Sequence, residues 1–324
     1  MLGSEYSFFI IGQSGDIMAE TAETHLTRLF NPAQRDVVIG ECLELATGAL
    51  DGDSASLLER QWRLTADLYR GTYPGYKACN TEYHDFAHTC DVLCATIRMC
   101  DGALSQGMRL DPGLYRDTVV AAMLHDAGYI QEADDDSGTG AKHTKEHVSR
   151  GIAFTARERE KFGLTAEQAA RIGRLILGTD LSVDFEGIPY ESTAERFAGQ
   201  LLASADLLGQ MADRTYLEKL LFLYYEFKEA GFPGYDTEFD ILKKTLGFYE
   251  MTRKRLFITL GNTAVMALHH FTARYGVHRN LYMDSIERQI EYLTEIIDDD
   301  TVNFRKKLKR LDLEAVSEAH RHRH

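Results

Sequence analysis

The chain has 324 residues, of which 44% are apolar and 27% charged, and its formal net charge is −14. These values are typical of a folded domain with a substantial core, and the negative charge argues against the basic surface that a DNA- or RNA-binding groove requires. No apolar run reaches the roughly 18 residues of a membrane span. We therefore expect a cytoplasmic protein that binds neither nucleic acid nor membrane.

The cysteines favour the same compartment. There are five, an odd number, and no two are spaced as Cys-x-x-Cys. This pattern indicates reduced, mostly buried thiols rather than a disulfide framework. The alternative is a structural zinc cluster of Cys79, Cys90 and Cys94, which lacks the usual ligand spacing.

The first residues differ from the rest of the chain. The stretch YSFFIIGQSGDIMAE has two apolar runs on either side of Gly-Gln-Ser-Gly-Asp. This pattern predicts a short β-hairpin in an N-terminal extension over residues 1–30. We expect it to be a flap that packs on the main domain, and a sensor or interaction edge is the alternative.

From residue 31 onward, apolar residues recur at helical spacing. Asn31 and Pro32 mark the start of a first helix, and Ser54 and Gly71 mark the two ends of a second. After a turn-rich connector, a third helix begins within the motif EYHDFAHTCD (82–91) and runs to residue 100. Further helices are predicted over 112–127, 144–160, 165–178, 193–213, 215–230, 236–260, 262–275 and 281–299.

These elements predict an all-α fold, a compact multi-helix bundle. We expect a catalytic domain over 31–280, followed by a C-terminal helix and tail over 281–324. The apolar face of that last helix suits packing or a homodimer. The polar loop over 132–143 contains no P-loop motif, so it is either a surface loop or a flap beside the site.

Three short motifs could hold a metal ion. His84 and His88 are four residues apart, so on a helix they share one face, which Asp91 joins. His125 and Asp126 end an apolar helix, where adjacent side chains can reach one ion. A hydrogen-bonded pair in the core is the alternative for these two residues, because unpaired burial is costly.

Asp206 completes the set. It lies within the apolar run LLASADLLGQM, so it needs a buried partner. With His88, His125 and Asp126 it gives two imidazoles and two carboxylates. Such a set suits zinc, manganese or iron, and a second, harder ion such as magnesium would bind through carboxylate and water.

The order of these motifs resembles the HD superfamily of metal-dependent phosphohydrolases, and more narrowly the catalytic domain of class I cyclic-nucleotide phosphodiesterases. That family opens with Tyr-His-Asn-x-x-His-Ala-x-Asp-Val, and residues 83–92 read YHDFAHTCDV. The stretch LILGTDLS (175–182) is similar to the family's Leu-Ala-Thr-Asp-Met-Ser. The resemblance covers roughly residues 60–260.

The resemblance implies a two-metal phosphodiesterase. Zinc, manganese or iron would occupy the first site, and magnesium or manganese the second. A hydroxide bridging the two ions would attack phosphorus, with His84 as the general acid that protonates the leaving oxygen. The implied ligands of the first ion are His88, His125, Asp126 and Asp206.

Asp126 would also bridge to the second ion, whose waters Glu146 and Thr179 would bind. Either residue could instead be a helix cap. The family has a further His where this chain has Tyr129, and His143 and His147 are candidate extra ligands in its place. Asp85 replaces the family's Asn, and the sequence gives it no role.

Substrate recognition departs from the family more strongly. The family holds the nucleobase with a Gln and, three residues later, a stacking Phe. In KKTLGFYE (243–250) the stacking residue is Phe248, but Thr245 replaces the Gln. An aromatic ring stacks without choosing the base, whereas an amide reads its hydrogen-bonding edge. Phe248 could also be a core aromatic residue.

We therefore expect a phosphodiesterase acting on a cyclic or other small nucleotide. The first alternative is an HD-type nucleotidase acting on a phosphomonoester. The second is a non-catalytic HD signalling module, although such modules typically lose ligands and this chain retains all four.

Overall fold

The computed structural model describes residues 25–29, 34–299 and 303–313. The described residues are mainly helical, which confirms the prediction of an all-α fold, and their β pairing is limited to an isolated bridge between Tyr76 and Glu132. The predicted hairpin lies outside the described residues. Within the predicted extension over 1–30 the structure describes the short helix α2 (Leu26–Leu29).

The other helices lie close to the predicted positions. They are α3 (Arg35–Thr47), α4 (Gly52–Arg70), α5 (Phe86–Ser105), α6 (Pro112–Leu124), α7 (His147–Glu158), α8 (Ala166–Leu177), α9 (Thr193–Ala212), α10 (Tyr216–Glu229), α11 (Glu238–Lys254), α12 (Val265–Tyr275) and α13 (Leu281–Asp298). Short 3₁₀ turns lie at η2 (Ala127–Tyr129), η3 (Gly140–His143), η4 (Phe185–Gly187) and η6 (Phe304–Lys306), and η5 (Arg255–Thr259) is π-helical.

Several predicted helix ends differ from the observed ones by three or more residues, and two of these lie at the candidate site. The helix predicted over 112–127 ends at Leu124, because Asp126 (φ −103°, ψ 11°) leaves the helical conformation and η2 follows. The helix predicted from 144 begins at His147, after a non-helical Glu146 (φ −128°, ψ 3°). Both corrections fall on candidate ligands, so these side chains extend from helix ends rather than from one helical face.

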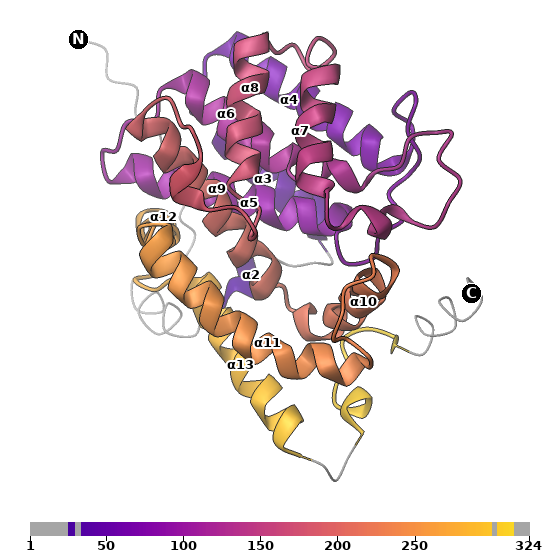
Figure 1. The fold of residues 1–324 in the computed structure, drawn as a ribbon. Helices are drawn as coiled ribbons and strands as arrows, with labels where there is room; N and C mark the ends of the chain where they lie inside the picture. Colours follow the sequence, from indigo (N-terminus) through magenta and orange to yellow (C-terminus); the bar gives the residue numbers. More distant parts are fainter. Residues whose placement is uncertain (1–24, 30–33, 300–302, 314–324) are drawn as a thin grey trace.

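Helix α5 forms the centre of the fold. Every residue from His88 to Ala103 is buried, because α5 packs against α3, α6, α9 and α12. A helix covered on all sides can be apolar all round, which explains why its sequence shows no clean polar face. In Figure 1 the helices α4, α6, α7 and α8 lie above this centre, and α11 and α13 lie side by side below it.

Two glycines bring the site segments together. A Cβ on Gly128, in η2, would lie 1.8 Å from the carbonyl oxygen of His147, so η2 packs directly on the start of α7. A Cβ on Gly209, in α9, would lie 3.1 Å from the backbone at Asp91, where α9 crosses α5. These close approaches place the chain near Asp126 beside α7, and the chain near Asp206 beside α5.

The five cysteines are free thiols, and all except Cys79 are buried, as predicted. No helix in the described part of the chain is both long enough and apolar enough to cross a membrane.

Candidate metal centre and adjoining cavity

His88 is fixed by the beginning of α5. The helix starts at Phe86, and the side chain of its N-cap Asp85 accepts a hydrogen bond from the backbone N–H of His88 at 2.8 Å. His84 therefore precedes the helix, and the prediction that both histidines share a helical face is wrong. Their rings are 5.8 Å apart and nearly perpendicular. The two imidazoles consequently have different environments.

Four side chains converge beside α5. Nε2 of His88, Nε2 of His125 and Oδ1 of Asp206 lie within 4.8 Å of one another. The two Nε2 atoms are 3.3 Å apart, and Oδ2 of Asp126 is 3.3 Å from each of them. Two ligands of one ion, at bonds near 2.1 Å and angles of 90–110°, are roughly 3.0–3.5 Å apart. The separations therefore suit donors that surround a single ion.

The ring orientation of His125 also suits a ligand. Its Nδ1 lies 2.9 Å from the carbonyl oxygen of Ala122, which can only accept, so Nδ1 carries the proton. In the neutral ring, Nε2 then directs a lone pair at the cluster. Oδ2 of Asp126 is buried and accepts no hydrogen bond from any described residue. A buried carboxylate oxygen of this kind needs a cation, and the residues present fit a divalent transition metal.

Charge within the cluster shifts the pKa values of its members. Burial opposes protonation of His88, but contacts with Asp126 and Asp206 outweigh it and raise the pKa of His88 to about 10. Burial likewise disfavours the charged form of Asp126, but His125 and His88 hold the pKa of this carboxyl well below its usual range. Without a metal, Asp126 and His88 thus stabilise each other's charged forms.

Asp126 faces two groups at once. Its Oδ2 faces His88 and His125, whereas its Oδ1 lies 3.7 Å from Nε2 of His147. Nδ1 of His147 lies 2.7 Å from the carbonyl oxygen of Thr144, so Nε2 is again the atom with the free lone pair. Burial lowers the pKa of His147, which favours the neutral ring that a metal needs. The arrangement suits a second ion between Asp126 and His147.

His84 has a carboxylate partner, Glu226 of α10. Nδ1 of His84 lies 2.6 Å from Oε2 of Glu226, and the Glu226 side chain is 5% exposed. The other oxygen, Oε1, accepts hydrogen bonds from the backbone N–H groups of Glu82 and Tyr83 at 3.0 and 2.7 Å. Glu226 therefore fixes both the backbone before α5 and the ring of His84.

Tyr129 links the two histidines that flank Asp126. Its buried ring stacks on His84, with centroids 4.4 Å apart, and on His147, at 4.5 Å, and the two imidazole centroids are 6.1 Å from each other. Its hydroxyl lies 3.5 Å from Nε2 of His84. Tyr129 therefore orients both imidazoles, although it carries no metal-ligating nitrogen.

A cavity of about 400 Å³ opens beside the cluster. Its polar wall includes His84, His88, Asp126, His147, Thr179 and Asp206. An apolar wall of the cavity is formed by Leu181, Leu223, Phe227, Phe232 and Phe248. Among the described lining residues, Lys145 is the one lysine or arginine; its ammonium group lies 5.1 Å over the ring of Phe232. The cavity therefore combines the polar side chains of the candidate metal centre with aromatic and aliphatic side chains.

Three candidate residues do not line this cavity. His143 pairs with Glu146 at 2.8 Å, and the Glu146 side chain is 58% exposed. Thr245 is buried in α11, and its hydroxyl donates to the carbonyl oxygen of Ile241.

Thr179, in contrast, does line the cavity, and its hydroxyl donates to the carbonyl oxygen of Ile176 at the end of α8.

The sequence reading missed Glu226, Lys145 and the apolar wall formed by Phe227 and Phe232. Glu226 lies within the apolar run LFLYYEF, and the same argument that singled out Asp206 applies to it. The partner of Glu226 is 142 residues away along the chain, so local spacing could not identify it.

Comparisons with known proteins add one family match. A family model described as Npun_R2479-like matches residues 133–259. The matched segment is less than half of the chain; it includes Asp206 and Glu226 and begins after Asp126. No curated protein and no solved structure matches the chain.

Proposed function

We propose that the chain is a metal-dependent phosphohydrolase, and that it hydrolyses a phosphodiester in a cyclic or other small nucleotide. The observation that carries this proposal is the convergence of His88, His125, Asp126 and Asp206 at ligand separations beside a cavity that His84 also faces. A purely structural role for this cluster would not explain why a cavity of about 400 Å³ with an aromatic wall adjoins it.

The donor set would hold two divalent ions. His88, His125, Asp126 and Asp206 suit zinc, manganese or iron, and Asp126 with His147 suits magnesium or manganese. When bound, such ions neutralise phosphoryl oxygens and lower the pKa of coordinated water. Thr179 lies in the cavity wall, where it would contact water or substrate.

His84 would act as the general acid. Glu226 holds Nδ1, so Nε2 is the atom free to donate a proton to the leaving oxygen. Tyr129 keeps the ring plane parallel to its own, which fixes the direction of Nε2.

The apolar wall would bind the leaving group. Phe227, Phe232 and Phe248 offer faces on which a nucleobase can stack, and Lys145 at the rim would attract an anionic substrate. Gln210 also lines the cavity, but its side chain already accepts from Tyr83 and donates to the backbone of Asp206.

A phosphomonoester is the second candidate substrate. It is favoured by Thr245, which bonds Ile241 and does not line the cavity, so this position would not read a nucleobase. A non-catalytic module is disfavoured because every implied ligand and the candidate acid remain together.

The decisive experiment is a substrate panel. Purified protein is incubated with manganese, magnesium or zinc and with 3′,5′-cyclic nucleotides, linear dinucleotides or nucleoside monophosphates. We expect turnover of a phosphodiester that a chelator abolishes. Turnover of monophosphates alone would favour the second candidate, and no turnover by metal-loaded protein would overturn the proposal.

A further inference from the structure

His88 differs from its neighbouring histidines in the hydrogen bonding of Nδ1. His125 and His147 each donate from Nδ1 to a backbone carbonyl, and His84 uses Nδ1 to contact Glu226. For Nδ1 of His88, the structure describes no direct partner among its described residues. Metal-bound histidines almost always donate the second ring N–H to a carboxylate, a carbonyl or a water molecule. His88 therefore lacks the contact that would fix its tautomer.

A small cavity lies where this partner is needed. It has a volume of about 10 Å³ and is lined by Tyr83, His88, Asp91, Gln210, Asp213 and Lys219. That volume is about enough for one water molecule, and the lining supplies several polar atoms.

Asp91 is the acceptor that this cavity offers to His88. The two residues are three apart in α5, so they lie on one face of the helix. The Asp91 side chain is 6% exposed, and its Oδ1 is buried and accepts no hydrogen bond from the part of the chain that the structure describes. The nearest cation on this oxygen is Nε of Arg35, at 4.0 Å.

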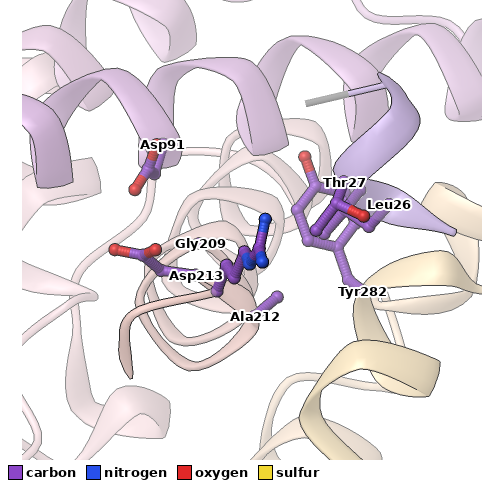
Figure 2. A pocket seen from close by; sticks show the side chains of 8 residues that line it. Leu26, Thr27, Asp91, Gly209, Ala212, Asp213 and Tyr282 are labelled. Atoms are coloured by element: carbon purple, nitrogen blue, oxygen red, sulfur yellow. The ribbon is translucent and has the colours of Figure 1, made fainter. Parts of the chain in front are cut away.

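Asp213 and Lys219 complete the surroundings. The ammonium group of Lys219 lies 2.7 Å from Oδ2 of Asp213, and both residues line the same small cavity as Asp91. Figure 2 shows Asp91 and Asp213 on one side of a neighbouring cavity, with Leu26 and Tyr282 on the other.

We propose that Asp91 is a positioning residue for the metal centre, which holds His88 through a water molecule bound between Nδ1 of His88 and the Asp91 carboxylate. Nδ1–H of His88 donates to the water, and the water donates to Asp91. The proton on Nδ1 leaves Nε2 as the ligand atom, and the carboxylate makes the ring a stronger donor. This inference rests on the metal centre of the proposed function.

The test is metal affinity of the full chain. We expect Asp91→Asn to raise the dissociation constant for cobalt(II) or zinc about tenfold or more, measured by competition with a chelator, as for other residues that support a metal-bound histidine. Asp91→Ala, which removes the acceptor, should weaken binding further. The visible absorption bands of bound cobalt(II) should shift in both variants, because the basicity of one ligand changes.

Asp101→Asn is the matched control. Asp101 is a buried aspartate of the same helix, and it pairs with His270 at 2.7 Å and with Arg274. Its variant should lower the melting temperature without changing metal affinity, whereas Asp91→Asn should change metal affinity without a larger loss of stability. Equal affinity in wild type and both Asp91 variants would overturn the inference alone. Wild-type protein that binds no transition metal would overturn the metal centre and the inference together.

Discussion

Asp85 connects the folding of α5 to the geometry of the candidate metal centre. As the N-cap it satisfies a backbone N–H group that no helical carbonyl can reach, and that group belongs to His88. The cap therefore sets where the first turn of α5 places the His88 ring. The sequence suggested a carboxylate of unknown role near the site, and the structure gives it a local, backbone-directed one.

Replacing Asp85 should affect both stability and metal binding. We expect Asp85→Ala to lower the free energy of unfolding by about 1 kcal/mol, as for other N-caps, and to weaken metal binding because His88 is no longer fixed. Asp51→Ala is the control, because Asp51 caps α4 through Ser54 in the same way but lies outside the site. Equal metal affinity in the two variants, measured by calorimetric titration, would contradict the role of Asp85.

Replacing His84 should separate chemistry from metal binding. We expect His84→Ala to retain its metal and to lose about 10²–10⁴-fold in kcat on a nucleotide phosphodiester, because the leaving alkoxide then lacks a proton donor. The loss should be much smaller on bis(p-nitrophenyl) phosphate, whose leaving group needs no proton. Metal loss from the variant, or an equal loss of rate on both substrates, would show that His84 has another role.

The elements of the site depend on close packing between η2 and α7. Gly128 permits this packing, and the result is that Asp126 and His147 face each other although they belong to different segments. Only glycine fits at position 128, because the backbone of His147 occupies the space that any side chain would need. The adjoining helix end also explains why Asp126 lies outside α6, where its two oxygens can face different imidazoles.

Filling that space should displace η2. We expect Gly128→Ala to lower the free energy of unfolding by ~1–3 kcal/mol through overpacking, and to weaken binding of a second metal ion more than the first. Gly40→Ala is the control, since a Cβ there meets nothing within 4 Å in α3, and it should stabilise the protein by about 0.5–1 kcal/mol. Thermal unfolding and metal titration measure both effects. A Gly128→Ala variant as stable as wild type would contradict the packing argument.

On the scale of the whole molecule, the candidate metal centre joins three segments of the fold. Its donors come from α5, from the chain between α6 and η2, and from α9. A bound ion would tie these segments together, and an ion present at 100 times its dissociation constant would stabilise the folded protein by about 2.7 kcal/mol. The metal centre is therefore expected to contribute to stability as well as to chemistry.

Metal binding should release protons. Contacts with Asp126 and Asp206 raise the pKa of His88 to about 10 against the opposing effect of burial, and the pKa of His125 is raised as well. His88 is thus protonated in the metal-free protein at neutral pH and must lose this proton to bind an ion. We expect metal affinity to rise with pH, by up to about tenfold per unit for each proton released, until the pH passes these pKa values.

The stability of the metal-free protein should change in the opposite direction. A raised histidine pKa contributes stability fully below pH about 6.5, and that contribution is lost as the pH rises through about 10. Calorimetric titration of the protein with metal, in two buffers of different ionisation enthalpy, counts the protons that metal binding releases. Binding that releases none would contradict the charge state described for the cluster.

The sequence predicted the helices well because their apolar spacing and caps are local properties. Pro112 and the capping residue Thr165 lie where α6 and α8 begin. The sequence made Asp206 and the pair His125 and Asp126 candidates because polar side chains interrupt or end apolar runs there, and it made His88 a candidate through its spacing from His84. The pairing of His84 with Glu226 was not predictable, because it depends on how α5 and α10 are placed. Thr245 bonds Ile241 within α11, but whether this residue lines the cavity depends on how α11 packs.

Helix α10 has a consequence for how such an enzyme would distinguish its substrates. It carries Leu223 and Phe227 of the apolar wall, and Glu226, which holds His84, lies between them. Three residues further on, Glu229 accepts hydrogen bonds from the backbone and hydroxyl groups of Thr139 in the loop before η3. A ligand that shifts Phe227 would move the carboxylate behind the proton donor with it. Recognition of the leaving group and readiness to protonate it would then be coupled mechanically, and a poorly fitting ligand would be held but turned over slowly.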